Sequence, residues 1–249
     1  MQSFRHFLSL FMLISIFATA PAIAKPVPVP ATKPAIEQPK PASPLPKPEP
    51  KQSPTPEPQN MQKPERIYQA ACLPLLQNEI TGKVLPPVKE GQCEIRSPLE
   101  ITAFNKPISI ALDQPVTTNC TMAVALNEWV QQANSLAKTH LGSDIKTIGS
   151  GSHYQCRNVN NGANGRVSEH AFANALDIMS FTLTNGETTE LAKDWNGKDK
   201  QKQFWRALHA KSCSLFMTVL GPEADDAHKT NLHLDMGCHG KSCTYRICQ

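Results

Sequence analysis

The chain has 249 residues, with 22 prolines, eight cysteines and a formal net charge of +4 at pH 7. This length predicts one domain of ordinary size with additional segments. The modest charge is weak evidence for an anionic partner, and we expect no nucleic acid among the partners.

The first 24 residues have the pattern of a secretory signal peptide. Arg5 and His6 precede a short apolar run, LFMLISIF, and small residues follow up to Ala24, after which cleavage is expected. The apolar run is too short for an ordinary membrane span. No cysteine follows it at a lipidation position, so we expect an exported product without a stable membrane anchor.

Residues 25–65 form a proline-rich block that holds 14 of the 22 prolines and no aromatic residue. Such a composition cannot bury a core and favours extended polyproline II. We therefore expect a semi-rigid spacer. A ligand for a wall polymer or for a proline-binding partner is the alternative, although no residue of the segment identifies that partner.

Residues 66–249 are enough for one well-packed domain and contain all eight cysteines. An even number of cysteines after a signal peptide indicates an oxidising compartment and disulfides, whose pairing the sequence does not select. The tail, however, has the spacing C-x4-C-x4-C from Cys238 to Cys248, with His239 inside it. A structural zinc site in the tail is therefore the alternative to disulfides there.

Helices and strands are expected in mixed order along this domain. Apolar residues recur at helical spacing over 120–142, with Thr118 or Asn119 as the N-cap and Gly142 at the end. Because strands and helices do not alternate regularly, the predicted fold class is α+β. The other expected elements are a helix over 198–213, an Asn- and Gly-rich loop over 158–166, and strands over 144–151, 175–184, 215–220 and 231–237.

His170 and Asp177 stand seven residues apart in the apolar stretch SEHAFANALDI. Seven residues span about 10.5 Å of helix or roughly 23 Å of strand, so the two side chains can hold one ion only if the chain bends back. We expect Asp177 at the start of a strand, between inward-facing Leu176 and Ile178, and His170 across a turn from it. Ser168 is expected to order this turn or bond a ligand rather than act as a nucleophile. A purely structural hydrogen bond between His170 and Asp177 is the alternative.

A third polar side chain makes a metal site more favourable. The stretch NLHLDMG places His233 and Asp235 on one face of a short strand. Together, His170, Asp177 and His233 would offer zinc three ligands and leave its fourth position open, as in catalytic zinc sites. Zinc of this kind lowers the pKa of a bound water to about 7. The sequence therefore predicts a three-ligand metal centre.

These segments also resemble those of known proteins. SEHAFANALD resembles the pattern Ser-x-His-x-x-Gly-x-Ala-x-Asp of the zinc D-Ala-D-Ala peptidases and related peptidoglycan peptidases (the LAS group), with Ala173 in place of the Gly. Over about 120–235 the chain is more similar to the bacterial extensin-like C-terminal domain family, with weaker similarity upstream to Cys72. The segments that carry this similarity are CTMAVALNEWV, SHYQCRN, SEHAFANALDI, FWRALHAKSC, FMTVLGP and LHLDMG.

The resemblance implies an LAS-like fold, in which a central antiparallel sheet flanked by helices carries zinc on His170, Asp177 and His233. It also implies a periplasmic or secreted peptidase of the bacterial envelope that hydrolyses an amide bond of peptidoglycan peptide through metal-activated water. Arg157 matches the position where LAS enzymes often place an arginine near the scissile carbonyl. A guanidinium there would stabilise an oxyanion or hold a terminal carboxylate. Arg166 is a competing candidate for this role.

The sequence departs from the family pattern at the general base. The base usually lies three residues before the last histidine ligand, as Glu or Asp, or two residues before it, as His. Thr230 and Asn231 occupy these positions, and neither accepts a proton near neutral pH. His228 is therefore the first candidate for the base, followed by Asp235, with Asp226 nearby.

Three functions stay open at this point. The first is a zinc peptidase of D,D or L,D specificity that cleaves a stem peptide or a cross-link. The second is a degenerate module that binds cell-wall peptide, keeps the metal site and lacks the base. The third is a structural wall protein in which the histidine and aspartate residues contribute stability alone.

Overall fold

A computed structural model describes residues 69–249 of the 249-residue chain. The signal peptide expected over 1–24 and the spacer expected over 25–65 lie outside the described residues. The strands are β1 (Ile80–Val84), β2 (Val88–Glu90), β3 (Cys93–Ile95), β4 (Leu99–Phe104), β5 (Ile110–Thr118), β6 (Ile145–Ser150), β7 (Ala175–Leu183), β8 (Thr188–Glu190), β9 (Thr218–Leu220), β10 (Leu232–Asp235) and β11 (Ile247–Cys248). The helices are α1 (Leu73–Leu76), α2 (Cys120–Leu141), α3 (Leu191–Asp194) and α4 (Asp199–Ser212), with short 3-10 turns η1 (Val159–Asn161), η2 (Glu169–Phe172) and η3 (Asp226–His228).

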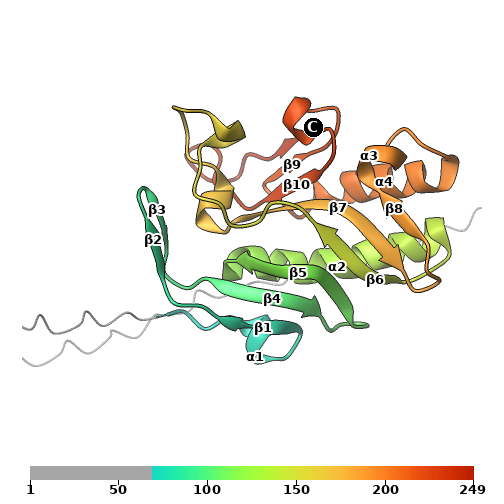
Figure 1. Cartoon of the computed structure of the whole chain (residues 1–249), viewed down its shortest axis with the longest axis horizontal. Helices are drawn as coiled ribbons and strands as arrows, with labels where there is room; N and C mark the ends of the chain where they lie inside the picture. Colours follow the sequence, from blue (N-terminus) through green and yellow to red (C-terminus); the bar gives the residue numbers. More distant parts are fainter. Residues whose placement is uncertain (1–68) are drawn as a thin grey trace, which may run out of the picture. The chain divides into compact units, whose positions relative to one another are not determined.

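Nine of the described strands form one mixed sheet in the order β1-β4-β5-β6-β7-β10-β9-β11, with β8 also paired to β7. The pairs β5–β6 and β9–β11 are parallel, and the other described pairs in this sheet are antiparallel. Strands β2 and β3 form a separate hairpin that projects from one end of the sheet (Figure 1). This arrangement confirms the predicted α+β class and the mostly antiparallel sheet.

Helix α2 is the longest described helix and forms much of the core. Asn119 caps it by accepting a hydrogen bond from Met122 N, and Gly142 ends it in the left-handed conformation at φ 73°. Trp129 is fully buried on its inner face and donates its indole N–H to Ser212 Oγ of α4 at 2.8 Å. The predicted helix is therefore confirmed, and the structure selects Asn119 as its cap.

The other predicted elements are also present, with small differences at their ends. Strands β6, β7, β9 and β10 and helix α4 lie inside the ranges that the pattern predicts. The pattern did not predict β1, β4 and β5, which form one side of the sheet, or the separate hairpin of β2 and β3. None of the described helices combines the length and apolar character that a membrane span requires.

All eight cysteines are paired, so the described residues contain no free thiol. This result confirms the predicted disulfides and removes the tail zinc site, because oxidised cysteines offer no thiolate to a metal. Four disulfides in one domain are typical of exported proteins. The pairs are Cys72–Cys120, Cys93–Cys156, Cys213–Cys248 and Cys238–Cys243.

Candidate metal centre

Asp177 and His233 are brought together by the pairing of β7 with β10. They are direct cross-strand partners, so their side chains leave the same face of the sheet. His233 Nδ1 lies 3.0 Å from Asp177 Oδ1. The neighbours Leu176 and Ile178 are buried in the core, as the alternation along the strand predicts.

His170 reaches the same point from η2, just before β7. Ser168 orders this turn by accepting a hydrogen bond from His170 N at 3.4 Å. Ala173 then adopts the left-handed conformation at φ 51° and turns the chain back into the strand. Glycine adopts that conformation more readily than alanine does. His170 Nε2 lies 3.5 Å from Asp177 Oδ1, so the expected fold-back is present.

The three side chains have the separations that a tetrahedral ion requires. The third distance, from His170 Nε2 to His233 Nδ1, is 3.3 Å. Two ligand atoms bonded at 2.0–2.1 Å to a tetrahedral zinc ion lie about 3.3 Å apart. Since the observed separations are 3.0, 3.3 and 3.5 Å, this buried group could bind a metal ion.

The outer nitrogen of each imidazole ring has an acceptor. His170 Nδ1 lies 2.6 Å from the backbone oxygen of His153, and His233 Nε2 lies 2.9 Å from Asp235 Oδ2. A carbonyl and a carboxylate can only accept, so both outer nitrogens carry protons. The inner nitrogens, Nε2 of His170 and Nδ1 of His233, are then the ones that offer lone pairs to an ion. Metal-binding histidines are commonly oriented in this way.

The two aspartates hold His233 as a cation when no metal is bound. Burial disfavours the charged ring, but hydrogen bonds to Asp177 and Asp235 outweigh it and raise the pKa of His233 to about 9. Burial likewise raises the pKa of Asp177, yet the adjacent His170 and His233 rings lower it well below its ordinary value. The pKa of Asp235 is also lowered, since hydrogen bonds from His233, Gly237 N and the Thr218 hydroxyl outweigh burial.

A pocket of about 360 Å³ opens over this group. Besides the three inner side chains, its lining comes from the loop over 157–169, the strands β9 and β10, and residues 227–231, 239 and 247–249. Arg157 and Arg166 both line it, and no described carboxylate pairs with either guanidinium within 4.0 Å. Arg157 donates to Gln155 Oε1 at 2.9 Å and to the Asn158 oxygen at 3.4 Å. The pocket thus presents two guanidinium groups to a ligand.

Of the three candidates for a base, His228 is best placed to act in the pocket. Its ring is buried, lines the pocket and lies 5.5 Å from the ring of His233, centroid to centroid. Its Nδ1 lies 2.6 Å from Asp225 Oδ1. Asp235 is occupied by His233 Nε2 and Gly237 N. Asp226 is fully exposed beside Lys229, outside the pocket.

Thr230 and Asn231, the two residues at the usual base positions, lie in different surroundings. Asn231 lines the pocket, whereas Thr230 is exposed and lies against a second hollow. Sequence analysis did not identify Asp225 or the backbone oxygen of His153. The run DDAH contains the signal for Asp225, because residues three apart on a helical turn can meet. A backbone acceptor has no signal in the sequence.

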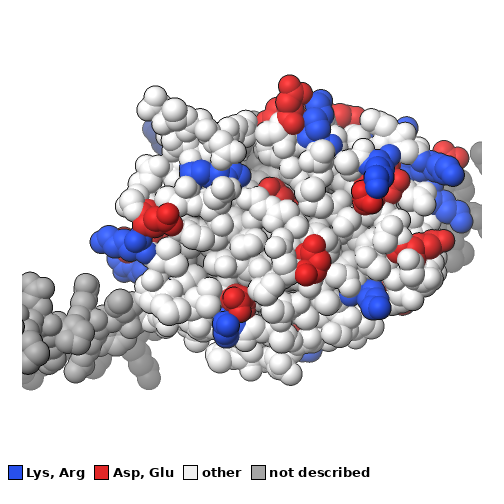
Figure 2. Space-filling view, in the orientation of Figure 1, with Lys and Arg blue, Asp and Glu red and all other residues white. Residues whose placement is uncertain are grey.

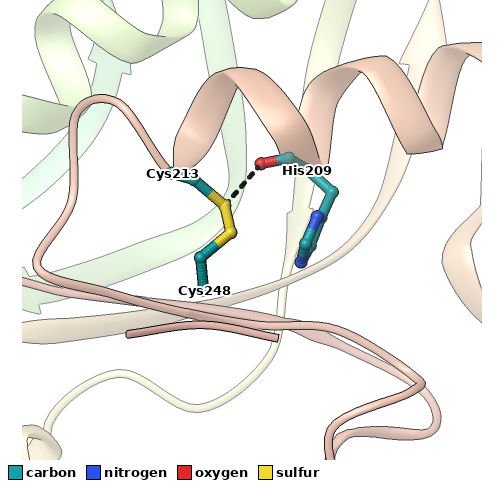
Figure 3. Close-up of side chains that lie close together, drawn as sticks. All are labelled: His209, Cys213 and Cys248. Atoms are coloured by element: carbon teal, nitrogen blue, oxygen red, sulfur yellow. Dashed lines mark hydrogen bonds between the residues drawn. A yellow bond between two sulfur atoms is a disulfide. The ribbon is translucent and has the colours of Figure 1, made fainter. Parts of the chain in front are cut away.

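A second group of potential ligand atoms is formed by His209, Cys213 and Cys248 (Figure 3). The two sulfur atoms are joined in a disulfide, and Cys213 Sγ lies 3.3 Å from the backbone oxygen of His209. Without a thiolate, this group lacks the donors that a metal would require.

On the face drawn in Figure 2, basic and acidic side chains of the described residues lie mostly beside one another.

The fold and the site together define a disulfide-rich α+β domain with a buried histidine–aspartate group that could bind a metal. The model of the extensin-like protein C-terminus matches residues 70–249, and the chain belongs to this family. The match includes the strands β1 to β5, upstream of the segments on which the resemblance rests. No curated protein and no solved structure matches the chain.

Proposed function

We propose that this protein is a periplasmic or secreted zinc-dependent peptidase that hydrolyses an amide bond of peptidoglycan stem peptides or cross-links. The observation that carries the proposal is the convergence of His170 Nε2, Asp177 Oδ1 and His233 Nδ1 in the floor of a pocket. Two imidazoles and one carboxylate at tetrahedral separations are a donor set that zinc favours in hydrolytic sites. The similarity of SEHAFANALD to the LAS peptidase pattern supports the substrate class.

Zinc in this position would supply Lewis-acid activation of water and of an amide carbonyl. Three ligands converge there from the described part of the chain, so a fourth coordination position would remain open to the pocket. His170 and His233 are held in the required tautomers by the His153 oxygen and by Asp235. The protein therefore contributes fixed ligands and a pocket that receives the substrate.

His228 is the general base in this proposal. Asp225 accepts a hydrogen bond from His228 Nδ1, which therefore keeps its proton, so Nε2 carries the lone pair and can take a proton from water in the pocket. The same nitrogen would return that proton to the departing amine. Asp225 acts as a positioning residue, because it selects the tautomer.

Arg157 and Arg166 supply the positive charge of the pocket. Each guanidinium lacks a paired carboxylate among the described residues, so either can donate to an oxyanion or to a carboxylate of the peptide. Two such groups favour a substrate with an anionic terminus or side chain. Stem peptides carry carboxylates of this kind.

The test is release of new amino groups from purified peptidoglycan by the zinc-loaded protein. We expect release to stop on chelation and to fall about 10²–10⁴-fold in His228→Gln, as for loss of a general base. His140→Gln, at the end of α2 and outside the pocket, is the matched control and should retain activity. Absence of amine release from the zinc-loaded wild-type protein would contradict the peptidase proposal.

The second candidate is a module that binds cell-wall peptide without cutting it. It is favoured by Thr230 and Asn231, which stand where related enzymes carry a titratable base. In that case wild-type protein and His228→Gln would cosediment equally with peptidoglycan, and neither would release amines. His170→Ala would lower the zinc content under both functions.

A further inference from the structure

Glu169 is a partly buried carboxylate on the wall of the pocket and is not one of the three converging ligands. It begins η2, immediately before His170, and its Oε2 accepts a hydrogen bond from Asn174 Nδ2 at 2.9 Å. Its other oxygen, Oε1, has no hydrogen-bond donor among the described residues and is not sealed from solvent. One oxygen of this carboxylate can therefore accept from a ligand in the pocket.

Neighbours on two sides hold the Glu169 carboxylate in place. Asn174 Oδ1 accepts from Asn119 Nδ2 at 3.0 Å, which orients the Asn174 amide so that its own Nδ2 donates to Glu169. Gly237 lies on another side, where a Cβ would come within 2.9 Å of Glu169 Oε1 and displace the carboxylate. The preceding N–H, of Met236, donates to the Asn174 oxygen at 3.1 Å and joins the two sides. The position of the carboxylate at the pocket wall is thus fixed by its surroundings.

The negative charge of Glu169 has no cationic partner in the described part of the chain. No described Lys, Arg or His nitrogen lies within 4.0 Å of its oxygens. Arg157 and Arg166 line the same pocket, and neither pairs with this carboxylate. A carboxylate partly removed from water is stabilised best by a cation that also donates hydrogen bonds. The pocket therefore presents charges of both signs that do not neutralise one another.

We propose that Glu169 is a specificity-determining residue that binds a free amino group of the peptide, as an ammonium, at Oε1. The inference rests on the proposed function for the peptide nature of the ligand. It adds a positive group to the anionic group that Arg157 and Arg166 recognise, so the ligand is a zwitterionic peptide. An ammonium has three N–H donors and no acceptor. It therefore matches the carboxylate oxygen and is repelled by the guanidinium groups, so the peptide binds in one orientation.

The probe is the disaccharide tetrapeptide released from peptidoglycan, which carries a free amino group on its diamino-acid residue. A second sample is N-acetylated with acetic anhydride, which converts this amino group to an amide and removes its positive charge. Calorimetric titration compares the two forms on the zinc-loaded chain, with His228→Gln added to prevent hydrolysis. We expect this parent to bind the native form about tenfold more tightly than the acetylated form, as for a hydrogen bond between charged groups.

Glu169→Gln removes the charge and keeps an amide oxygen that can still accept from Asn174 Nδ2. In this variant the native form should bind about tenfold more weakly than in the parent, the acetylated form should bind as before, and the zinc content should be unchanged. Glu187→Gln is the matched control, because Glu187 is an exposed carboxylate in the turn between β7 and β8, outside the pocket. It should keep the tenfold preference for the native form.

Equal binding of the two forms by the parent would overturn the inference and leave the proposed function standing. The same holds if Glu169→Gln keeps the tenfold preference. Equal weakening of both forms in Glu169→Gln would assign Glu169 to the structure of the pocket wall alone and also overturn its role in recognition. If the parent binds neither form, the proposed function itself fails and the inference falls with it.

Discussion

Asp177 and His233 face each other across the β7–β10 pair, with Oδ1 and Nδ1 3.0 Å apart, although 56 residues separate them in the chain. Register alone places them there. A slip of one residue in either strand would turn one of the two side chains to the opposite face of the sheet. The geometry of the candidate metal centre therefore depends on the register of β7 and β10. The burial of Leu176, Ile178 and Leu234 stabilises that register.

Metal binding should release a proton. His233 lies between Asp177 and Asp235, and its pKa is raised to about 9. The ion therefore competes with a proton for the ring nitrogen. Below that pH the proton must leave before Nδ1 can bind, so the apparent zinc affinity should rise about tenfold per pH unit from 7 to 9 and then level. Calorimetric titrations in buffers of different ionisation enthalpy measure the proton count. A pH-independent affinity with no proton released would contradict the assignment of His233.

The metal-free protein should lose stability as the pH rises. His233 has a raised folded-state pKa, so its contribution is complete below the unfolded value of about 6.5 and is lost as the pH passes through about 9. The loss is of the order of 3 kcal/mol, because one pKa unit corresponds to about 1.4 kcal/mol. Asp177 and Asp235 have lowered pKa values, so their contributions are present above about pH 4 and are lost on acidification.

Thermal unfolding in the presence of a chelator checks this dependence. The melting temperature should be highest between about pH 4 and 6.5 and should fall by pH 9. His233→Gln removes the titrating ring, so its melting temperature should be lower at pH 6 and nearly flat from pH 7 to 9. An equal alkaline decline in the wild type and in this variant would show that another group is responsible.

The Cys93–Cys156 disulfide should control substrate binding more than metal binding. It ties β3 of the projecting hairpin to the residue before Arg157, and Gln92 Nε2 adds a hydrogen bond to Asn158 Oδ1 at 3.2 Å. Replacing both cysteines by serine should lower the free energy of unfolding by about 2–4 kcal/mol. The loop that carries Arg157 should loosen, so we expect the KM for peptidoglycan peptide to rise with zinc stoichiometry unchanged.

The matched control is replacement of Cys72 and Cys120, whose disulfide joins the start of the domain to the first turn of α2. A comparable loss of stability is expected, without the change in KM. Equal changes in KM for the two pairs would mean that general destabilisation is responsible rather than the position of Arg157. Binding of a peptidoglycan peptide to each cysteine variant, measured with His228→Gln added to prevent hydrolysis, compares the two disulfides without turnover.

The parts of the fold that sequence reasoning predicted are those with strong local signals. Helix α2 has apolar periodicity and two caps, and β7 is a nine-residue strand in which apolar residues predominate. Strands β1 to β5 gave no comparable signal, because β1 and β4 are interrupted by irregular pairing and β5 has three consecutive exposed residues around Pro115. Their pairing is set by long-range contacts, which a local pattern does not contain.

Part of the candidate site could also be predicted from the sequence. His170, Asp177 and His233 were identified from residue type and spacing, and His228 from its proximity in sequence to His233. The acceptor role of the His153 oxygen, the link between Asp225 and His228, and the bond between His239 and Thr218 depend on tertiary structure. A sequence names the side chains that can bind a metal, but the partners that fix their tautomers come from the fold.

Asn119 should couple helix capping to the metal centre. Its Oδ1 accepts from Met122 N at 2.9 Å, and its Nδ2 donates to the Phe172 oxygen at 3.2 Å and to Asn174 Oδ1 at 3.0 Å. The first bond caps α2, whereas the other two hold the turn that carries His170. Asn119→Ala should therefore cost about 1–2 kcal/mol of stability for the cap and should also weaken zinc binding.

Asn119→Ser separates the two effects, because serine also caps helices but lacks the amide donor. We expect Asn119→Ser to regain most of the stability while zinc binding stays weaker than in the wild type, since the turn before Asp177 is less firmly held. Glu128→Ala, on the exposed side of α2, is the control and should change stability by no more than about 0.5 kcal/mol. Chemical unfolding and competition with a chromogenic chelator measure the two quantities. Wild-type zinc affinity in Asn119→Ala would show that the ligands are positioned by the β7–β10 pair alone.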